Sequence, residues 1–180
     1  MKVLETERLL LRPFAEGDLS DFFSYAKDPD IGPNAGWPPH ETHAQTKEVI
    51  LRFMAEDNVW ALEEKISRRV IGSLGVHRDG RRDRSDAVRM IGYALGKSWW
   101  GKGYMTEAVE RVLQFLFVEK GLEMVTVYHF DSNKRSQRVI EKCGFHREGI
   151  LRQASRLYDG RVQDDVCYSM TREEYTALHG

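Results

Sequence analysis

The sequence has few cysteines, no charge excess of either sign and no long hydrophobic run. Its two cysteines, Cys143 and Cys167, form no CxxC motif, which predicts a reduced, cytoplasmic protein. Lysine and arginine number 27, and aspartate and glutamate number 28, so no overall field attracts nucleic acid or an acidic membrane. No stretch approaches the roughly 20 apolar residues of a membrane-spanning helix, and the first residues lack a signal-peptide run. We expect a soluble protein that binds neither nucleic acid nor membranes.

The length of 180 residues suits one domain spanning residues 1–180. In its first part, alternating apolar residues predict a strand over about residues 7–14, and helical spacing predicts a helix over residues 18–28. A second helix begins at a capping box of Thr42 and Gln45. Its predicted buried stripe comprises Val49, Ile50, Phe53 and Met54.

Three strand-like runs follow, and their short connections predict antiparallel neighbours. They span residues 59–64, 70–77 and 88–95. The connection at residues 79–86 opens with the turn dipeptide Asp79-Gly80 and carries six charges. Its arginines would suit an acidic partner, but a solvated hairpin tip of mixed charge is the preferred interpretation.

The sequence of the second half of the chain predicts two parallel strands joined by a helix. A helix with a strong apolar face covers residues 105–116, Gly121 ends it as a left-handed cap, and residues 123–130 form the next strand. A helix between two strands makes those strands parallel. Asn133 then caps another helix, which Gly144 ends. Two final strands, at residues 145–154 and 165–170, flank a turn at residues 158–160.

The segment of residues 30–40 is rich in proline and glycine and is predicted as a loop around an exposed Trp37. Such a loop covers a pocket or fills space, and both interpretations stay open. His40 and His43 raise the question of a metal site. No cysteine or histidine cluster elsewhere completes four ligands, and the two residues are not within one helix. We therefore predict no metal.

The most informative stretch is the glycine-rich turn of residues 98–108, which leads into an amphipathic helix. Glycines let the backbone approach a ligand, and a helix N-terminus attracts phosphate. A P-loop needs four residues between its first glycine and Gly-Lys-Ser, whereas only three separate Gly92 from Gly96. A dinucleotide-binding turn follows an early strand of a parallel unit, whereas three antiparallel-looking strands precede this turn. The third interpretation is a turn that binds the pyrophosphate of coenzyme A.

Several runs resemble a known family. Residues 91–95 together with residues 100–108 resemble motif A of the GNAT superfamily of N-acetyltransferases, and residues 133–145 resemble its motif B. Further matches resemble the RimJ/RimL-like subgroup, which includes ribosomal-protein N-terminal acetyltransferases. These lie at residues 7–13, 36–39, 160 and 164–169. Ser98 and Met90 depart from the superfamily pattern, and Met90 stands where many relatives carry an acidic residue.

The resemblance implies a GNAT fold with acetyl-CoA as the acetyl donor. This is an α/β fold whose mixed central sheet of about six or seven strands splays between the parallel fourth and fifth strands, with helices on both faces. Backbone N–H groups at the glycine turn would hold the pyrophosphate, and the pantetheine arm would follow the strand before it. The implied cofactor-binding residues are Tyr93, Ala94, Leu95, Trp100, Gly101, Lys102, Gly103, Tyr104, Met105, Thr106, Asn133 and Ser136.

Acetyl transfer to an amine needs a held thioester, a stabilised oxyanion and a proton for the leaving thiolate. The resemblance implies that Ser136 protonates the thiolate, and a backbone N–H near Leu95 is the candidate oxyanion donor. The candidate general bases are Glu63, Glu64 and Asp164, and a water relay is the alternative. Cys143 has no evident histidine partner, so direct transfer is preferred over an acetyl-cysteine intermediate.

We therefore expect an acetyl-CoA-dependent N-acetyltransferase, with a protein N-terminal α-amine as acceptor, for example on a ribosomal protein. A small amine, such as an aminoglycoside, a polyamine or an amino acid, is the alternative acceptor. A cofactor-binding module without catalysis and an NAD-dependent oxidoreductase are the alternatives from other classes. A homodimer is considered as the oligomeric state.

Overall fold

The computed structural model describes residues 1–84 and 86–180, and shows an α/β fold with a mixed sheet of eight strands in the order β1-β2-β3-β4-β5-β6-β8-β7. The strands are β1 (Leu4–Glu5), β2 (Leu9–Pro13), β3 (Val59–Glu64), β4 (Arg69–His77), β5 (Val88–Leu95), β6 (Met124–Phe130), β7 (His146–Arg156) and β8 (Val162–Thr171). The helices are α1 (Leu19–Ala26), α2 (His43–Glu56), α3 (Tyr104–Gln114), α4 (Lys134–Lys142) and α5 (Arg172–His179). The shorter helical turns are η1 (Glu16–Asp18), η2 (Gly32–Ala35), η3 (Lys97–Trp99) and the π-helical η4 (Phe115–Glu119).

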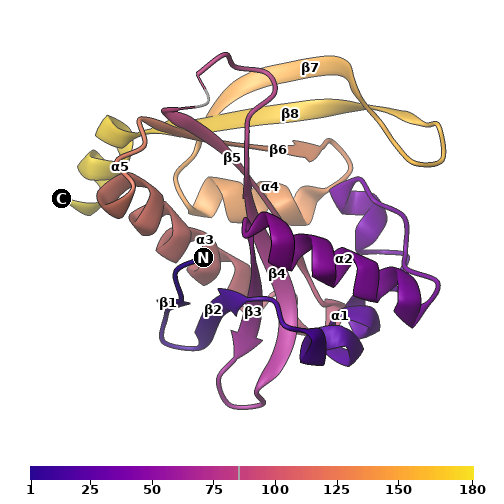
Figure 1. The fold of residues 1–180 in the computed structure, drawn as a ribbon. Helices are drawn as coiled ribbons and strands as arrows, with labels where there is room; N and C mark the ends of the chain where they lie inside the picture. Colours follow the sequence, from indigo (N-terminus) through magenta and orange to yellow (C-terminus); the bar gives the residue numbers. More distant parts are fainter. Residues whose placement is uncertain (85) are drawn as a thin grey trace. The chain divides into compact units, whose positions relative to one another are not determined.

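The chain divides into two compact units, of which the first comprises residues 1–75 and 93–108. In this unit β2 pairs antiparallel with both β1 and β3, and β3 pairs antiparallel with β4. The antiparallel pairing predicted for residues 59–64 and 70–77 is therefore confirmed. Figure 1 shows α1 and α2 side by side.

The core of the first unit gathers apolar residues from α1, α2 and the strands. Its buried members are Phe14, Phe22, Tyr25, Ala26, Ile31, Ile50, Val59, Ala61, Val70 and Ala94. Trp37 and Trp100 pack against this cluster, so the expectation of an exposed Trp37 is wrong. Met54 was expected in the buried stripe of α2 but is 43% exposed. It lies eleven residues after the helix start at His43, where the stripe has turned away from the core.

The second unit comprises residues 76–92 and 109–180. Here β5 pairs with β6 in parallel from Val88–Met124 to Met90–Thr126, which confirms the predicted parallel connection. The pairing stops at Thr126, although β6 continues to Phe130 against β8. Figure 1 shows β7 and β8 as a long hairpin, and the two strands pair antiparallel.

Two helical segments end at the glycines that the sequence predicts as caps. Gly121 has a φ of +67°, as the left-handed cap requires, although the chain leaves α3 through the π-helical turn η4 and not through an uninterrupted α-helix. Gly144 has a φ of +80°, and Phe145 N donates to Ile140 O (3.3 Å), which is the predicted helix end. The predicted cap of α2 forms in part. Thr42 Oγ1 accepts from Gln45 N (3.1 Å), whereas Gln45 Oε1 accepts from the amide of Glu41 and not from that of Thr42.

The charged connection after β4 is exposed at Gly80, Arg81, Asp83, Arg84 and Asp86, as predicted for a solvated tip, but its first residue is not solvated. Asp79 is buried, and its carboxylate accepts from Arg81 N (2.9 Å), Arg82 Nη1 (2.8 Å) and Thr126 Oγ1 (2.9 Å). Arg82 also donates to Glu148. Asp79 can be buried because the Thr126 hydroxyl, the Arg81 amide and the Arg82 guanidinium satisfy a carboxylate that water would otherwise solvate. Ser85, which belongs to the expected tip, lies outside the described residues.

Candidate active site

A turn with two glycines in the left-handed backbone region connects η3 to α3 in the first unit. Gly101 has a φ of +74° and Gly103 a φ of +84°, a conformation that residues with a side chain rarely adopt. The first hydrogen bond of α3 runs from Glu107 N to Gly103 O (3.1 Å). The amides of Tyr104 and Met105 therefore precede the helical ladder, as in an anion-binding helix N-terminus.

An ion pair braces this turn against the segment that enters β2. Arg8 Nε donates to Glu107 Oε2 (2.6 Å), and Arg8 Nη1 donates to the carbonyl of Lys102 (2.9 Å). The second carboxylate oxygen of Glu107 accepts from Thr6 Oγ1 (2.5 Å) and from Arg8 N (2.9 Å). Burial alone would raise the pKa of Glu107, but the hydrogen bonds from Thr6 and Arg8 outweigh it and lower that pKa. A charged Glu107 therefore fixes both the turn and the first turn of α3.

Aromatic side chains fix the chain on either side of the turn. Trp100 Nε1 donates to the carbonyl of Leu95 (2.8 Å), so the end of β5 is anchored from the turn itself. The rings of Trp99 and Tyr104 meet edge to face, with centroids 5.5 Å apart. The Arg8 guanidinium lies 4.3 Å from the centroid of the Tyr104 ring. These contacts leave the turn little freedom to change its backbone conformation.

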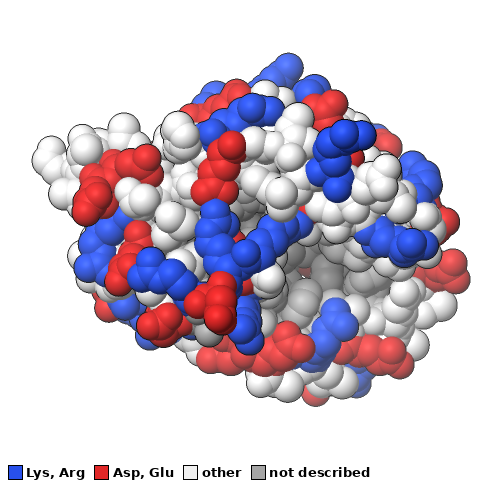
Figure 2. Space-filling view, turned by 90° about the horizontal axis from the view of Figure 1, so that it is seen from above, with Lys and Arg blue, Asp and Glu red and all other residues white. Residues whose placement is uncertain are grey.

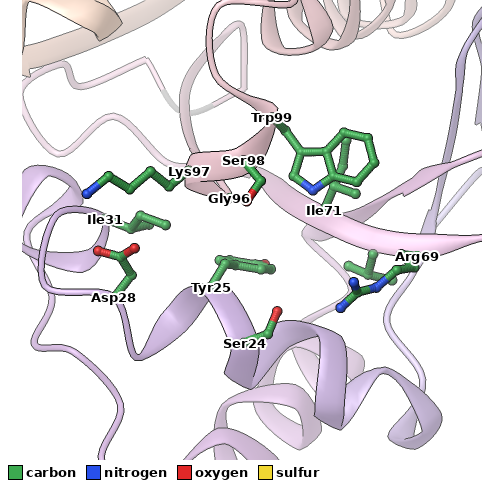
Figure 3. Close-up of a pocket in the computed structure, with 11 residues that line it drawn as sticks. Ser24, Tyr25, Asp28, Ile31, Arg69, Ile71, Gly96, Lys97, Ser98 and Trp99 are labelled. Carbon is green, nitrogen blue, oxygen red and sulfur yellow. The ribbon is translucent and has the colours of Figure 1, made fainter. Parts of the chain in front are cut away.

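A cleft of about 200 Å³ lies beside the residues that lead into the turn. Its lining comprises Ser24, Tyr25, Asp28, Ile31, Arg69, Val70, Ile71, Gly96, Lys97, Ser98 and Trp99. In Figure 3, Asp28 and Ile31 lie on the side of Lys97, and Arg69 and Ile71 lie on the side of Trp99. Arg69 pairs with Asp21 (3.0 Å) and Lys97 pairs with Asp30. The cleft therefore has a mixed polar and aromatic lining, in which both cations are already members of ion pairs.

In the second unit, Asn133 caps α4 as predicted. Its side-chain oxygen accepts from the amide of Ser136 (3.1 Å). This bond places Ser136 in the first turn of α4, and both side chains are half-buried. The geometry fixes the positions of the two residues relative to each other. Their roles toward a thioester stay predictions.

The three candidate bases each hold a structural hydrogen bond. Glu63 Oε2 accepts from Arg12 Nε (2.6 Å), and Arg12 also pairs with Asp18 (2.7 Å). Glu64 is buried, and its carboxylate accepts from the amides of Ile66 (3.3 Å) and Ser67 (2.7 Å). The hydrogen bonds from Ser67 lower the pKa of Glu64. Asp164 accepts from Gln153 N (2.7 Å). Each carboxylate thus closes a turn or joins strands, whatever its part in the reaction.

The histidines considered for a metal point to different partners. His40 Nδ1 lies 2.9 Å from Thr46 Oγ1, whereas the ring of His43 lies 4.1 Å from that of Phe23. Within residues 1–84 and 86–180 no group of three or more metal-ligating side chains is found. Cys143 is buried, and this burial raises its pKa to about 12. Such a thiol is a poor nucleophile at neutral pH.

The surface carries both signs of charge. Figure 2 shows lysine and arginine side chains intermixed with aspartate and glutamate over the visible face. In the part of the chain that the structure describes, no helix is long and apolar enough to cross a membrane. Neither feature distinguishes a protein acceptor from a small amine.

The predicted cofactor residues of the first unit form one connected segment from Tyr93 to Thr106, around the end of β5 and the turn. Ala94 and Met105 are buried. Sequence reasoning missed the brace of Arg8 and Glu107. Both residues stand in the runs that resemble the family, but nothing in the sequence pairs residues 99 positions apart. Their spacing along the chain carries no signal of contact.

The comparisons with known proteins agree with this geometry. A family model described as "Acetyltransferase (GNAT) domain" matches residues 8–146. An uncharacterised N-acetyltransferase of Bacillus licheniformis is 28% identical over 180 residues, which cover 97% of this chain and 99% of that protein. The [ribosomal protein uS5]-alanine N-acetyltransferase of Escherichia coli is 29% identical over 86 residues, or 48% of this chain and 44% of that enzyme.

Among solved structures, the crystal structure of a GNAT-family acetyltransferase from Bacillus anthracis superposes with a TM-score of 0.87. It is 23% identical in sequence, and the match covers 96% of this chain and 100% of the other. At this identity the likeness concerns the fold. It confirms the mixed sheet with the parallel β5–β6 pair as the architecture that this sequence adopts.

Proposed function

The chain belongs to the acetyltransferase (GNAT) family, whose donor is acetyl-CoA, and we propose that it transfers the acetyl group to the N-terminal α-amine of a protein. The observation that carries this acceptor is the local similarity to the E. coli enzyme that acetylates an alanine of ribosomal protein uS5. The same similarity supports membership of the RimJ/RimL-like subgroup. A small amine is the alternative acceptor.

The glycine turn is the proposed pyrophosphate site. The backbone N–H groups of Gly101, Gly103, Tyr104, Met105 and Thr106 would bind the phosphate oxygens. The two left-handed glycines and the start of α3 support this proposal, because glycine-rich turns that lead into a helix N-terminus commonly bind phosphate groups. Lys102 would add a positive charge. The pantetheine arm would lie along Tyr93, Ala94 and Leu95, next to Trp100, with a backbone N–H near Leu95 as the oxyanion donor.

The proposed chemistry is direct attack. The neutral amine nitrogen attacks the thioester carbonyl, the carbon–sulfur bond breaks, and the thiolate takes a proton as the amine loses one. Asn133, which caps α4, would also hydrogen-bond the pantetheine arm. Ser136, set in the first turn of α4 by that cap, would protonate the thiolate. Glu63, Glu64 and Asp164 stay candidates for the base, beside a water relay.

The acceptor is tested with three substrates at equal concentration. They are a peptide that begins with alanine, the same peptide with its N-terminus already acetylated, and a panel of small amines including a polyamine and an aminoglycoside. We expect coenzyme A release and acetylation of the α-amine, located by mass spectrometry, with the free peptide alone. Turnover restricted to the small amines would replace the proposed acceptor. Absence of turnover with every amine would leave a binding module.

The role of Ser136 is tested in the same assay. Ser136→Ala should lower kcat about tenfold or more, because general acid help is usually worth 10²–10⁴ in rate. The KM for acetyl-CoA should change little. Ser132→Ala, an exposed serine before the same helix, is the matched control. An unchanged kcat in Ser136→Ala removes Ser136 from the mechanism.

Three further proposals follow from the same features. We propose that residues 1–180 form one acetyltransferase domain. We propose a cytoplasmic location, which the low cysteine content supports, because the sequence has two cysteines and no CxxC motif. A homodimer is the proposed assembly, to be measured by sedimentation at several protein concentrations.

A further inference from the structure

The Arg81 side chain contacts Tyr128, Asp165 and Met90, all within the second unit. We call this cluster of groups, which suit a cation, the box. The Arg81 guanidinium carbon is 4.4 Å from the centroid of the Tyr128 ring. Its Nη2 donates to Asp165 Oδ2, and its Nη1 lies 3.9 Å from the Met90 sulfur. An aromatic face together with a carboxylate is the combination that binds ammonium and guanidinium groups.

Asp165 has bonding capacity that Arg81 does not use. The Asp165 side chain is 0% exposed, and Ser155 Oγ donates to the same oxygen, Oδ2, that Arg81 contacts (2.9 Å). The other oxygen, Oδ1, is buried and has no hydrogen-bond partner within residues 1–84 and 86–180. Leaving such a buried acceptor without a partner is unfavourable, because it has lost its hydrogen bonds to water. A structural ion pair would be expected to use both oxygens of the carboxylate, as the Arg82–Glu148 pair does.

The loop around Arg81 is held by other groups. Its turn is fixed by the Asp79 carboxylate, which accepts from the backbone N of Arg81, from Arg82 and from Thr126. Arg82 then donates to both oxygens of Glu148 (2.6 Å each). The Arg81 side chain is 29% exposed and reaches solvent. It can therefore leave the box while the backbone of the loop stays in place.

The box lies where β6 stops pairing with β5. Thr126 is the last β6 residue that pairs with β5, and Tyr128 follows two residues later on the same face of the strand. Phe130, opposite Asp165 in the β6–β8 register, continues that face. Asn133 and Ser136, which the proposed function assigns to the thioester, follow β6 along the chain in the same unit.

We propose that Tyr128, Ser155 and Asp165 form a cation subsite for the acceptor, and that Arg81 occupies this subsite in the free protein. The subsite would hold a second ammonium or guanidinium group of the acceptor, distinct from the amine that is acetylated. This inference rests on the proposed function and names the acceptor class as an amine with an additional positive charge. Exchange of one cation for another keeps Asp165 paired, whereas departure of Arg81 alone would leave a buried charge uncompensated.

The test measures binding by calorimetry without acetyl-CoA, so that it does not depend on catalysis. The probes form two pairs, 1,4-diaminobutane against 1-aminobutane and the C-terminally amidated peptide Ala-Lys-Ala against the amidated Ala-Gln-Ala. In Arg81→Ala the dication of at least one pair should bind about tenfold more tightly than in the unchanged protein, because its competitor is gone. The monocation of that pair should bind as before. A response of the diaminobutane pair identifies the ligand as a small polyamine, and a response of the peptide pair identifies it as a basic peptide.

Two variants test the other walls of the box, and one serves as control. Asp165→Asn and Tyr128→Leu, each in the Arg81→Ala background, should abolish the preference for the dication. Arg84→Ala removes an exposed arginine of the same loop, paired with the exposed Glu123, and should change neither affinity. Circular dichroism confirms that each variant is folded.

If Arg81→Ala binds both dications no more tightly than the unchanged protein, Arg81 is a structural latch and the subsite is wrong. Tyr128→Leu alone distinguishes this case even if Arg81→Ala fails to fold, because loss of the ring should weaken dication binding only if a subsite exists. The proposed function fails separately. A protein that shows the dication preference but releases no coenzyme A with any amine retains the subsite and loses the acetyltransferase proposal.

Discussion

Glu107 illustrates how one carboxylate can organise a glycine-rich turn. It lies on the polar side of α3 by helical spacing, yet its two oxygens accept from Thr6 and from the backbone and side chain of Arg8. Arg8 also donates to Lys102 O, so the Glu107 carboxylate holds the turn indirectly, by fixing the Arg8 side chain. Its helical position favours a negative charge as well, since it stands in the first turn of α3.

Glu107→Gln tests this brace. The variant keeps the size of the side chain but loses the charge, so we expect the free energy of unfolding to fall by about 1.5–3 kcal/mol, the range for hydrogen bonds to charged groups. The KM for acetyl-CoA should rise because the turn loosens, with a smaller effect on kcat. Denaturant unfolding and steady-state kinetics measure the two effects. Glu110→Gln, an exposed position on the same helix, is the control, and equal behaviour of both variants would contradict the brace.

At the scale of the element, the loop of residues 30–40 is anchored by its last residue. His40 N donates to the carbonyl of Ala26 (3.0 Å), and Thr46 Oγ1, which donates to the carbonyl of Thr42 (3.1 Å), is left to accept from His40 Nδ1 (2.9 Å). The ring also packs against Phe22. The loop is therefore attached to both α1 and α2 through a neutral imidazole with its proton on Nδ1.

His40 should make stability depend on pH. Burial, and then the charge of Arg52, lower its pKa below the ordinary value of 6.5. The unfolded chain therefore binds the proton more readily, so the stabilising contribution is present above about pH 6.5 and is lost as the pH falls through the lowered pKa. One proton limits this effect to roughly 1.4 kcal/mol per pH unit. Urea unfolding between pH 7.5 and 5 should show the slope, with values chosen around the reference pKa of about 6.5.

A pair of variants assigns that slope to His40. His40→Gln should be less stable at neutral pH and should lose part of the slope. His43→Gln, at an exposed position at the start of α2, should keep the slope of the unchanged protein. A slope that survives in His40→Gln would place its origin at another group.

At the scale of the whole molecule, three elements pass from one compact unit to the other. β4, β5 and α3 each begin in one unit and end in the other. A helix forms and unfolds cooperatively along its length, so α3 couples the unfolding of the two units that it joins. Residues 1–180 are therefore expected to unfold as one cooperative domain.

The chain offers a separate probe for each unit. All four tryptophans, Trp37, Trp60, Trp99 and Trp100, belong to the first unit. Both cysteines belong to the second, where burial protects Cys143. Tryptophan fluorescence and the exposure of Cys143 to a thiol reagent should follow one unfolding curve in urea. Two midpoints separated beyond experimental error would show two domains instead.

The sequence by itself determined the local features of this protein. Helical and alternating periodicity located α1 to α4 and the main strands, and Asn133, Gly121 and Gly144 predicted caps that the structure confirms. Such features depend on neighbours within a few residues, so the sequence contains them. The resemblance to the family, read from the same runs, identified the fold and the acetyl donor.

Only the tertiary structure decided which distant side chains meet. The Arg8–Glu107 brace, the burial of Asp79 and the box around Arg81 join residues that no periodicity relates. Trp37 was predicted to be exposed because prolines and glycines surround it in the sequence, but it packs against the core cluster that includes residues of α1 and α2. A charged residue is solvated or buried according to the partners that the fold brings to it, and those partners come from other strands and helices.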